Sequence, residues 1–256
     1  MYNTFSSSFR AGRRPGVITN PNVLPNLQIW YNADVSNTTN FNVAPANGDD
    51  VSQWKDRSGT GHNANQSGNA SVKPNWYSNI QNGYGIIRYN GSSESLNVNP
   101  VSPWLISQAG FTLLVVAKAS SLASASDLTT SDVSGIRIFH NGTNWGVQTS
   151  GGTGTSTVTG DTTKFHIFTL IFDGSQPDNA TRLRFRYDGA DQALSFSGTV
   201  GTTTSASATK LYLGVGSTGS ANYFNGDMGE IIMFTRSLNT NDLLATEEYM
   251  KYHWAL

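Results

Sequence analysis

The sequence of 256 residues contains no cysteine and few charged residues. Without thiols, the chain can form no disulfide, no catalytic thiolate and no cysteine-based zinc site. Its 16 basic and 17 acidic side chains give a net charge of -1, whereas a nucleic-acid-binding protein needs a basic surface. No apolar run reaches the roughly 18 residues of a membrane-spanning helix, and residues 1–26 lack the apolar core of a secretory signal. These absences predict no nucleic-acid partner, no membrane insertion and no signal peptide.

Strong helix formers are also scarce. Only 4 Glu and 6 Lys occur, beside 25 Asn and 26 Gly, which favour turns. This balance predicts an all-β protein with many loops. A chain of this length can bury a sufficient core in one domain without covalent cross-links.

Short apolar stretches separated by turn residues predict a series of strands. Residues 111–118 and 165–172 are apolar on both faces, as expected of strands that lie between two layers. In residues 182–187 three arginines alternate with apolar side chains, which predicts a half-buried strand with a solvated face carrying Arg182, Arg184 and Arg186. Three stretches rich in Ser, Thr, Gly and Ala are expected to be surface loops or edge strands: residues 119–131, 149–163 and 197–209.

The two ends of the chain differ from this pattern. At the C-terminus, Asn239 is a plausible N-cap, and Leu243, Met250 and Trp254 recur at near-helical spacing, which predicts one helix. Residues 1–26 are polar and contain proline, so they predict an extended arm in front of a domain spanning residues 27–256. The arm's expected anchoring side chains are Phe5, Phe9, Arg10, Arg13 and Arg14.

Four segments of the chain resemble the laminin-G-like, concanavalin A-like jelly-roll family of bacterial and phage surface proteins. The most distinctive is VSQWKDRSGTGHNANQ at residues 51–66, with its Trp-x-Asp-x-Ser-Gly turn; the others are residues 27–34, 82–96 and 223–254. The resemblance implies a two-layer antiparallel jelly-roll sandwich. The Ser-rich arm with its Arg-Arg-Pro-Gly sequence resembles the N-termini of tailed-phage structural proteins, including those of marine myoviruses.

Catalysis is not predicted. Glycosidases on this fold need two carboxylates about 5–10 Å apart in a cleft. The nearest approach is Asp227 and Glu230, whose odd spacing places them on opposite faces of a regular strand. Two further glutamates, Glu247 and Glu248, lie on the predicted helix. No cofactor is expected.

Binding residues are suggested by residue type. Aromatic rings stack on sugars, and four aromatic side chains lie in or beside predicted turns: Trp76, Tyr77, Trp145 and Tyr223. Asp56 is expected to organise its Ser-Gly turn by accepting backbone N–H groups, with Trp54 packed beneath. Relatives of the fold often bind calcium, and the weak candidates for that alternative are Asp56 and Asp227.

Together these features predict a non-enzymatic structural protein of a phage virion. It would be displayed in many copies on the particle surface, as a capsid decoration or fibre protein or at the neck or tail. The arm would hold it to other virion proteins, and its loops could bind host-surface glycans weakly. The alternatives are a carbohydrate-binding adhesin module of a bacterial cell-surface protein and, third, a glycoside hydrolase.

Overall fold

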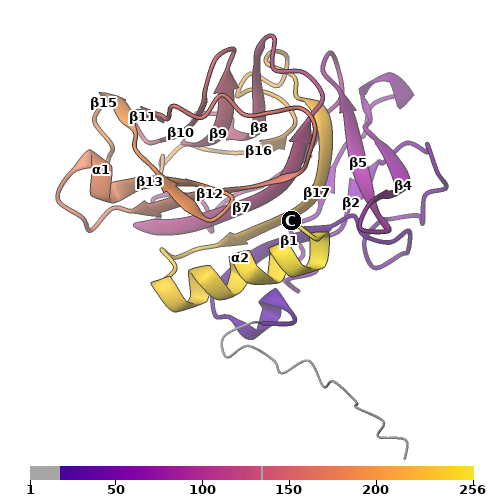
Figure 1. Cartoon of the computed structure of the whole chain (residues 1–256), viewed down its shortest axis with the longest axis horizontal. Helices are drawn as coiled ribbons and strands as arrows, with labels where there is room; N and C mark the ends of the chain where they lie inside the picture. Colours follow the sequence, from indigo (N-terminus) through magenta and orange to yellow (C-terminus); the bar gives the residue numbers. More distant parts are fainter. Residues whose placement is uncertain (1–17, 134) are drawn as a thin grey trace, which may run out of the picture.

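The computed structural model describes residues 18–133 and 135–256. Two antiparallel sheets stack face to face, and one long helix lies along the outer side of sheet A (Figure 1). This confirms the predicted all-β, two-layer sandwich with a C-terminal helix. Most of the predicted arm lies outside the described residues; within the remainder, Pro21–Val23 form a 3-10 helix, η1. Within the described ranges we find no helix with the length and apolarity to span a membrane.

Sheet A has eight strands. Along the sheet they run β14 (Ala190–Gln192), β13 (Leu183–Tyr187), β12 (His166–Asp173), β7 (Gly110–Ala119), β17 (Asn225–Phe234), β5 (Tyr84–Asn90) and β4 (Asn75–Gln81). The eighth strand, β1 (Leu27–Asn32), pairs with the half of β17 that β5 leaves free.

Sheet B has nine strands. They run β15 (Ser195–Gly198), β11 (Gly152–Thr155), β10 (Trp145–Thr149), β9 (Ile136–Asn141), β8 (Ala125–Ser131), β16 (Leu211–Leu213), β6 (Leu96–Val98), β3 (Ala64–Asn65) and β2 (Gln53–Trp54). Two further short helices, α1 (Asn179–Arg182) and the 3-10 helix η2 (Ala70–Val72), lie in connections.

Two apolar clusters hold the layers together. The first lies between the sheets, and the second lies between sheet A and the C-terminal helix. Strand β7 contributes to both, since Leu113 and Val115 belong to the first cluster and Leu114 and Val116 to the second. This explains why residues 111–118 are apolar on both faces, and it confirms the prediction that this strand lies between two layers.

The C-terminal helix α2 (Thr240–Trp254) begins as predicted. The Asn239 side chain accepts the backbone N–H of Asp242, and Leu243, Met250 and Trp254 are buried against sheet A. Its last turn is fixed by the β4–β5 hairpin, where Gln81 donates to the Trp254 carbonyl at 2.7 Å. That bond satisfies a carbonyl that a helix end otherwise leaves without a partner.

Two low-complexity stretches are not loops or edge strands as expected. Residues 149–163 include β11, which lies between β10 and β15. Residues 119–131 include β8, which is a central strand of sheet B and lies between β9 and β16. Its side chains from Ser126 to Ser131 are buried. Two of its hydroxyls form local hydrogen bonds, Ser131 with the N–H groups of Gly135 and Ile136 and Thr130 with the Ser131 carbonyl, whereas those of Ser126 and Thr129 have no partner among the described residues.

The arginine face predicted for residues 182–187 is also corrected. Arg182 belongs to α1, and its guanidinium donates to backbone carbonyls rather than facing solvent. Arg186 is only 8% exposed, because α2 covers it and Glu247 binds its guanidinium at 2.9 Å. The alternation of arginine and apolar residues predicted strand β13 correctly. It could not predict that α2 covers the polar face of this strand, because α2 is distant in the sequence.

Candidate functional site

Asp227 and Glu230 lie on the same face of β17, contrary to the sequence-based expectation. The pairing of β17 with β7 shifts register between Met228 and Glu230, which marks a β-bulge at Gly229. A bulge adds one residue, so two positions of odd spacing share a face. Gly229 suits this place because a Cβ there would lie 2.7 Å from the Trp254 ring.

These two carboxylates do not form a hydrolytic pair. Asp227 is buried and binds Arg88 Nε at 2.6 Å and Lys118 Nζ at 3.6 Å. Glu230 is fully buried under α2, and its carboxylate accepts four hydrogen bonds, from Trp30 Nε1 (2.7 Å), Asn32 Nδ2 (3.1 Å), Tyr249 OH (2.9 Å) and Trp254 Nε1 (2.7 Å). Burial raises the pKa of Glu230, while the charge of His253 and these donors oppose the rise. Both carboxylates therefore serve the fold.

Asp56 organises its turn as predicted. Its two carboxylate oxygens accept backbone N–H groups from Trp30, Ser58, Gly61 and His62 and the hydroxyls of Ser58 and Thr60. Trp54 packs nearby, with its ring centroid 5.4 Å from that of Tyr31. With their lone pairs engaged by N–H and O–H donors, the Asp56 oxygens are poorly placed as calcium ligands. Asp227 is engaged by two cations instead, and the described residues contain no group of three or more ligand side chains arranged for a metal ion.

The four candidate aromatic residues do not form one site. Trp76 and Trp145 are buried, at 6% and 1% exposure, so their ring faces are not available to a sugar; this corrects the expectation that they lie exposed. Tyr77 is half-buried beneath the Arg88 guanidinium, 4.6 Å from the ring centroid. Tyr223 is half-buried in a separate loop. The candidate anchoring residues Phe5, Phe9, Arg10, Arg13 and Arg14 lie outside the described residues.

A different polar surface crosses the whole of sheet B. Starting from Gln53 on β2, each residue pairs in register with the next across nine strands. We call this set the cross-strand row: Gln53, Asn65, Asn97, Tyr212, Thr130, Arg137, Gln148, Thr153 and Ser197. Residues directly opposite on paired strands share a face. Leu211 and Leu213, on either side of Tyr212, point into the core, so the row lies on the outer face.

The cross-strand row is polar along its whole length, but Thr130 near its centre is fully buried, so eight of the nine side chains reach the surface. Eight steps of about 4.8 Å give it a length of about 38 Å. Four of its side chains make no hydrogen bond with any residue that the structure describes: Tyr212, Gln148, Thr153 and Ser197. The row therefore offers a line of donors and acceptors free to bind a ligand.

Arg137 is held rigidly near the centre of the row. Asp127 binds its Nε and Nη2, and the guanidinium lies 4.3 Å from the centroid of the Phe139 ring. Phe139 in turn lies over Gly146, where a Cβ would come within 2.7 Å of the ring. Because Asp127 neutralises the guanidinium, the row presents a fixed donor, Nη1, without a net positive charge.

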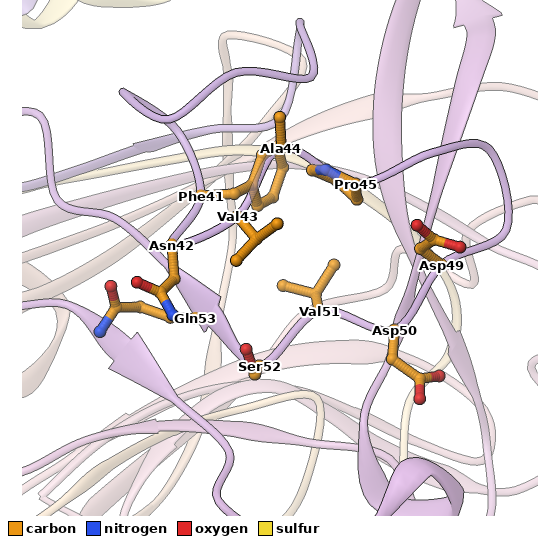
Figure 2. A pocket seen from close by; sticks show the side chains of 10 residues that line it. All are labelled: Phe41, Asn42, Val43, Ala44, Pro45, Asp49, Asp50, Val51, Ser52 and Gln53. Carbon is orange, nitrogen blue, oxygen red and sulfur yellow. The ribbon is translucent and has the colours of Figure 1, made fainter.

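A small cavity adjoins the β2 end of the row. It has a volume of about 70 Å³ and is lined by Phe41, Asn42, Val43, Ala44, Pro45, Asp49, Asp50, Val51, Ser52 and Gln53 (Figure 2). Figure 2 shows Val43 and Val51 pointing toward one another, with Gln53 on one side and the two aspartates on the other. Gln53 thus belongs both to this cavity and to the row.

Sequence reasoning missed the row for a physical reason. Its nine residues come from nine strands, some of two or three residues, and each is an ordinary polar residue with no distinctive neighbours. Only strand order and register place them in line. Alternation in the short strands, as in Leu96-Asn97-Val98, is the one local signal that these side chains face outward.

Glu94 is a buried carboxyl near this end of sheet B. It is 8% exposed and accepts one hydrogen bond, from the Asn90 N–H at 2.8 Å. Burial, with a smaller contribution from the charge of Asp50, raises the pKa of Glu94 to about 7. The folded protein therefore binds this proton more tightly than the unfolded chain does.

We expect this linkage to appear in the stability of the protein. The contribution of Glu94 to the free energy of unfolding should fall as pH rises from about 4.5 to about 7 and should then level off. In Glu94→Gln that contribution should be absent, as measured by urea unfolding at a series of pH values. Glu248→Gln, on the exposed side of α2, should keep the wild-type profile. An unchanged profile in Glu94→Gln would show that Glu94 does not hold its proton in this range.

Comparisons with known proteins establish the fold. Neither a family model nor a curated protein matches the chain. Among solved structures, the Trypanosoma rangeli sialidase in complex with the inhibitor DANA is 14% identical, with a TM-score of 0.56 over 86% of this chain and 32% of its own. Domain 4 of AbnA, a GH43 extracellular arabinanase from Geobacillus stearothermophilus, in complex with arabinotriose, is 14% identical, with a TM-score of 0.51 over 87% of this chain and 98% of its own. The binding domain of botulinum neurotoxin DC, in complex with rat synaptotagmin II, is 12% identical, with a TM-score of 0.58 over 91% of this chain and 53% of its own. The chain thus spans about a third of the sialidase, and at these identities what it shares with all three is the two-sheet fold.

Proposed function

We propose that this domain is a non-catalytic glycan-binding module, in which the outer face of sheet B binds an extended, neutral oligosaccharide. The observation that carries the proposal is the cross-strand row of nine polar side chains, all of which except Thr130 reach the surface. Amides and hydroxyls match the hydroxyl groups of a sugar chain, because both sides can donate and accept. A row about 38 Å long suits a polymer rather than a single sugar.

The charges of the row favour a neutral ligand. Its one cation, Arg137, is already paired with Asp127, and none of its nine members is a carboxylate. A non-catalytic role agrees with this composition, since glycosidic hydrolysis needs two carboxylates beside the bond. Similarity to a domain solved with arabinotriose supports the choice of a sugar ligand without identifying it.

Binding of this kind is expected to be weak for one domain. Except for Tyr212, the row lacks aromatic side chains, so affinity would come mainly from hydrogen bonds, each contributing about 0.5–1.5 kcal/mol. Many linked copies would convert weak binding into strong attachment. Display on a phage particle, the context that the sequence predicts, would supply such copies, and we retain it as part of the proposal.

The proposal is tested by removing polar groups from the row. In Gln148→Ala and in Tyr212→Phe, each lost hydrogen bond of about 1 kcal/mol should weaken binding about fivefold. Binding is measured by affinity gel electrophoresis against soluble neutral polysaccharides, arabinan among them. Gln192→Ala, on sheet A, is the matched control and should bind as the wild type does. The proposal fails if no polysaccharide retards the protein or if the double variant of Gln148 and Tyr212 is retarded as strongly as the control.

A further inference from the structure

The small cavity at the β2 end of the cross-strand row, which we call the end cavity, is continuous with the row. Gln53 is the terminal member of the row and also lines the cavity (Figure 2). The volume of the end cavity, about 70 Å³, is roughly half that of an apolar cavity of about 150 Å³ that holds a benzene ring. The end cavity therefore has room for a substituent of a few atoms but not for a whole sugar ring.

One side of the end cavity is apolar. Val43 and Val51 point toward one another across it (Figure 2), and Phe41 lines it as well. Val51 and Phe41 are buried, whereas Val43 is 71% exposed. A side chain this exposed contributes little to the core, so the methyl groups of Val43 remain available to a ligand.

The other side of the end cavity is polar. The Asn42 amide and the Ser52 hydroxyl make no hydrogen bond with any residue that the structure describes. Asp50 accepts from the Asn75 amide through Oδ1 at 3.0 Å, and its Oδ2 has no partner in the same described ranges. The cavity thus offers N–H and O–H donors and a carboxylate acceptor beside a set of methyl groups.

Backbone hydrogen bonds to neighbouring segments hold both walls of the end cavity in place. The Gly48 N–H donates to the Trp76 carbonyl at 2.7 Å, and the Val51 N–H donates to the Pro74 carbonyl at 2.8 Å. Because the site is preformed, binding there would cost little ordering of the loop.

We propose that the end cavity is a subsite for the acetamido group of an N-acetylated sugar in a neutral glycan that lies along the row. This inference rests on the proposed function and names the class of its ligand. An acetamido group places a methyl group against the two valines, while its N–H and carbonyl groups match the acceptor and the donors of the polar side. It carries no charge, in agreement with the neutral ligand that the row favours.

Other common substituents match only one side of the end cavity. A hydroxyl group would satisfy the polar side but would leave the methyl groups of Val43 in water. An ammonium group would be attracted by Asp49 and Asp50, but it would lose hydration against Val43 and Val51. The acetamido group is the substituent that suits both sides.

The test compares two oligosaccharides that differ only in the substituent at C2. Each sugar of chitohexaose carries an acetamido group there, and each sugar of cellohexaose carries a hydroxyl group. Binding of each to the full chain is measured by isothermal titration calorimetry. The variant Val43→Ser removes the exposed part of the apolar wall, and the matched control is Val23→Ser, which changes a 64% exposed valine on η1 outside the cavity.

We expect the wild type and Val23→Ser to bind chitohexaose about tenfold more tightly than cellohexaose, since one methyl group is buried and one hydrogen bond is added. In Val43→Ser this preference should fall to about threefold, because the methyl group loses part of its contact. Both variants change exposed side chains, so both should fold as the wild type does.

Three results would overturn the subsite and leave glycan binding intact. These are equal binding of the two oligosaccharides, tighter binding of the fully deacetylated hexamer than of chitohexaose, and a wild-type preference in Val43→Ser. Binding of arabinan without binding of chitohexaose would have the same meaning. If no neutral glycan binds the wild type at all, the proposed function and the subsite both fail.

Discussion

Replacing Glu230 by alanine should lower the free energy of unfolding by about 4 kcal/mol, because the change removes the carboxylate to which four buried groups donate. The two indole N–H groups of Trp30 and Trp254 are the most costly, since each donates to the carboxylate at 2.7 Å inside the contact between sheet A and α2. Among the described residues, Glu230 is the only acceptor of either indole N–H. The loss should therefore act on the attachment of the whole helix.

This prediction is checked by urea unfolding followed through tryptophan fluorescence. The control is Glu248→Ala, which removes an exposed carboxylate from the same helix and should change stability by less than about 0.5 kcal/mol. Glu230→Gln should lie between the two, because its amide keeps an oxygen acceptor but adds an N–H group that faces donors. A loss below about 1 kcal/mol in Glu230→Ala would mean that Glu230 does not hold α2 to the sheet.

Asp56→Ala should have the second largest effect, a loss of about 3 kcal/mol. Its carboxylate accepts six hydrogen bonds, four from backbone N–H groups, and the loop that curls around it depends on them. Gly59 and Gly61 adopt φ values of 91° and 82°, which lets the loop turn its N–H groups inward. Without the acceptor, the loop keeps only its few other hydrogen bonds, such as those from the Ser58 and Thr60 hydroxyls to the Gln28 carbonyl.

Thermal or urea unfolding measures the loss, and Asp49→Ala gives the comparison. Asp49 is exposed and accepts a single backbone N–H, from Ala46 at 2.8 Å, so its removal should cost about 1 kcal/mol or less. Faster proteolysis between residues 57 and 62 should accompany the loss in Asp56→Ala, since an open loop is cleaved more easily. Equal stability of the two variants would contradict the structural role of Asp56.

Local sequence was sufficient where one element carries its own signal. The helix at 240–254 follows from Asn239 and the spacing of Leu243, Met250 and Trp254, and the Asp56 turn follows from residues within six positions of it. The strands at 111–118 and 165–172 were recognisable because they are apolar on both faces. These features depend on contacts between near neighbours or on burial alone. Such contacts leave a local signal in the sequence, either a periodic spacing of apolar residues or a set of turn residues.

The sequence by itself determined the all-β composition, the strands with strong patterns, the terminal helix and the Asp56 turn. Only the tertiary structure decided that the bulge at Gly229 turns Asp227 and Glu230 to one face, that Glu247 of α2 covers Arg186, and that nine polar side chains stand in line across sheet B. The physical reason is the same in each case. Register and strand order depend on pairings between residues far apart in the chain, and such pairings leave no period in the sequence.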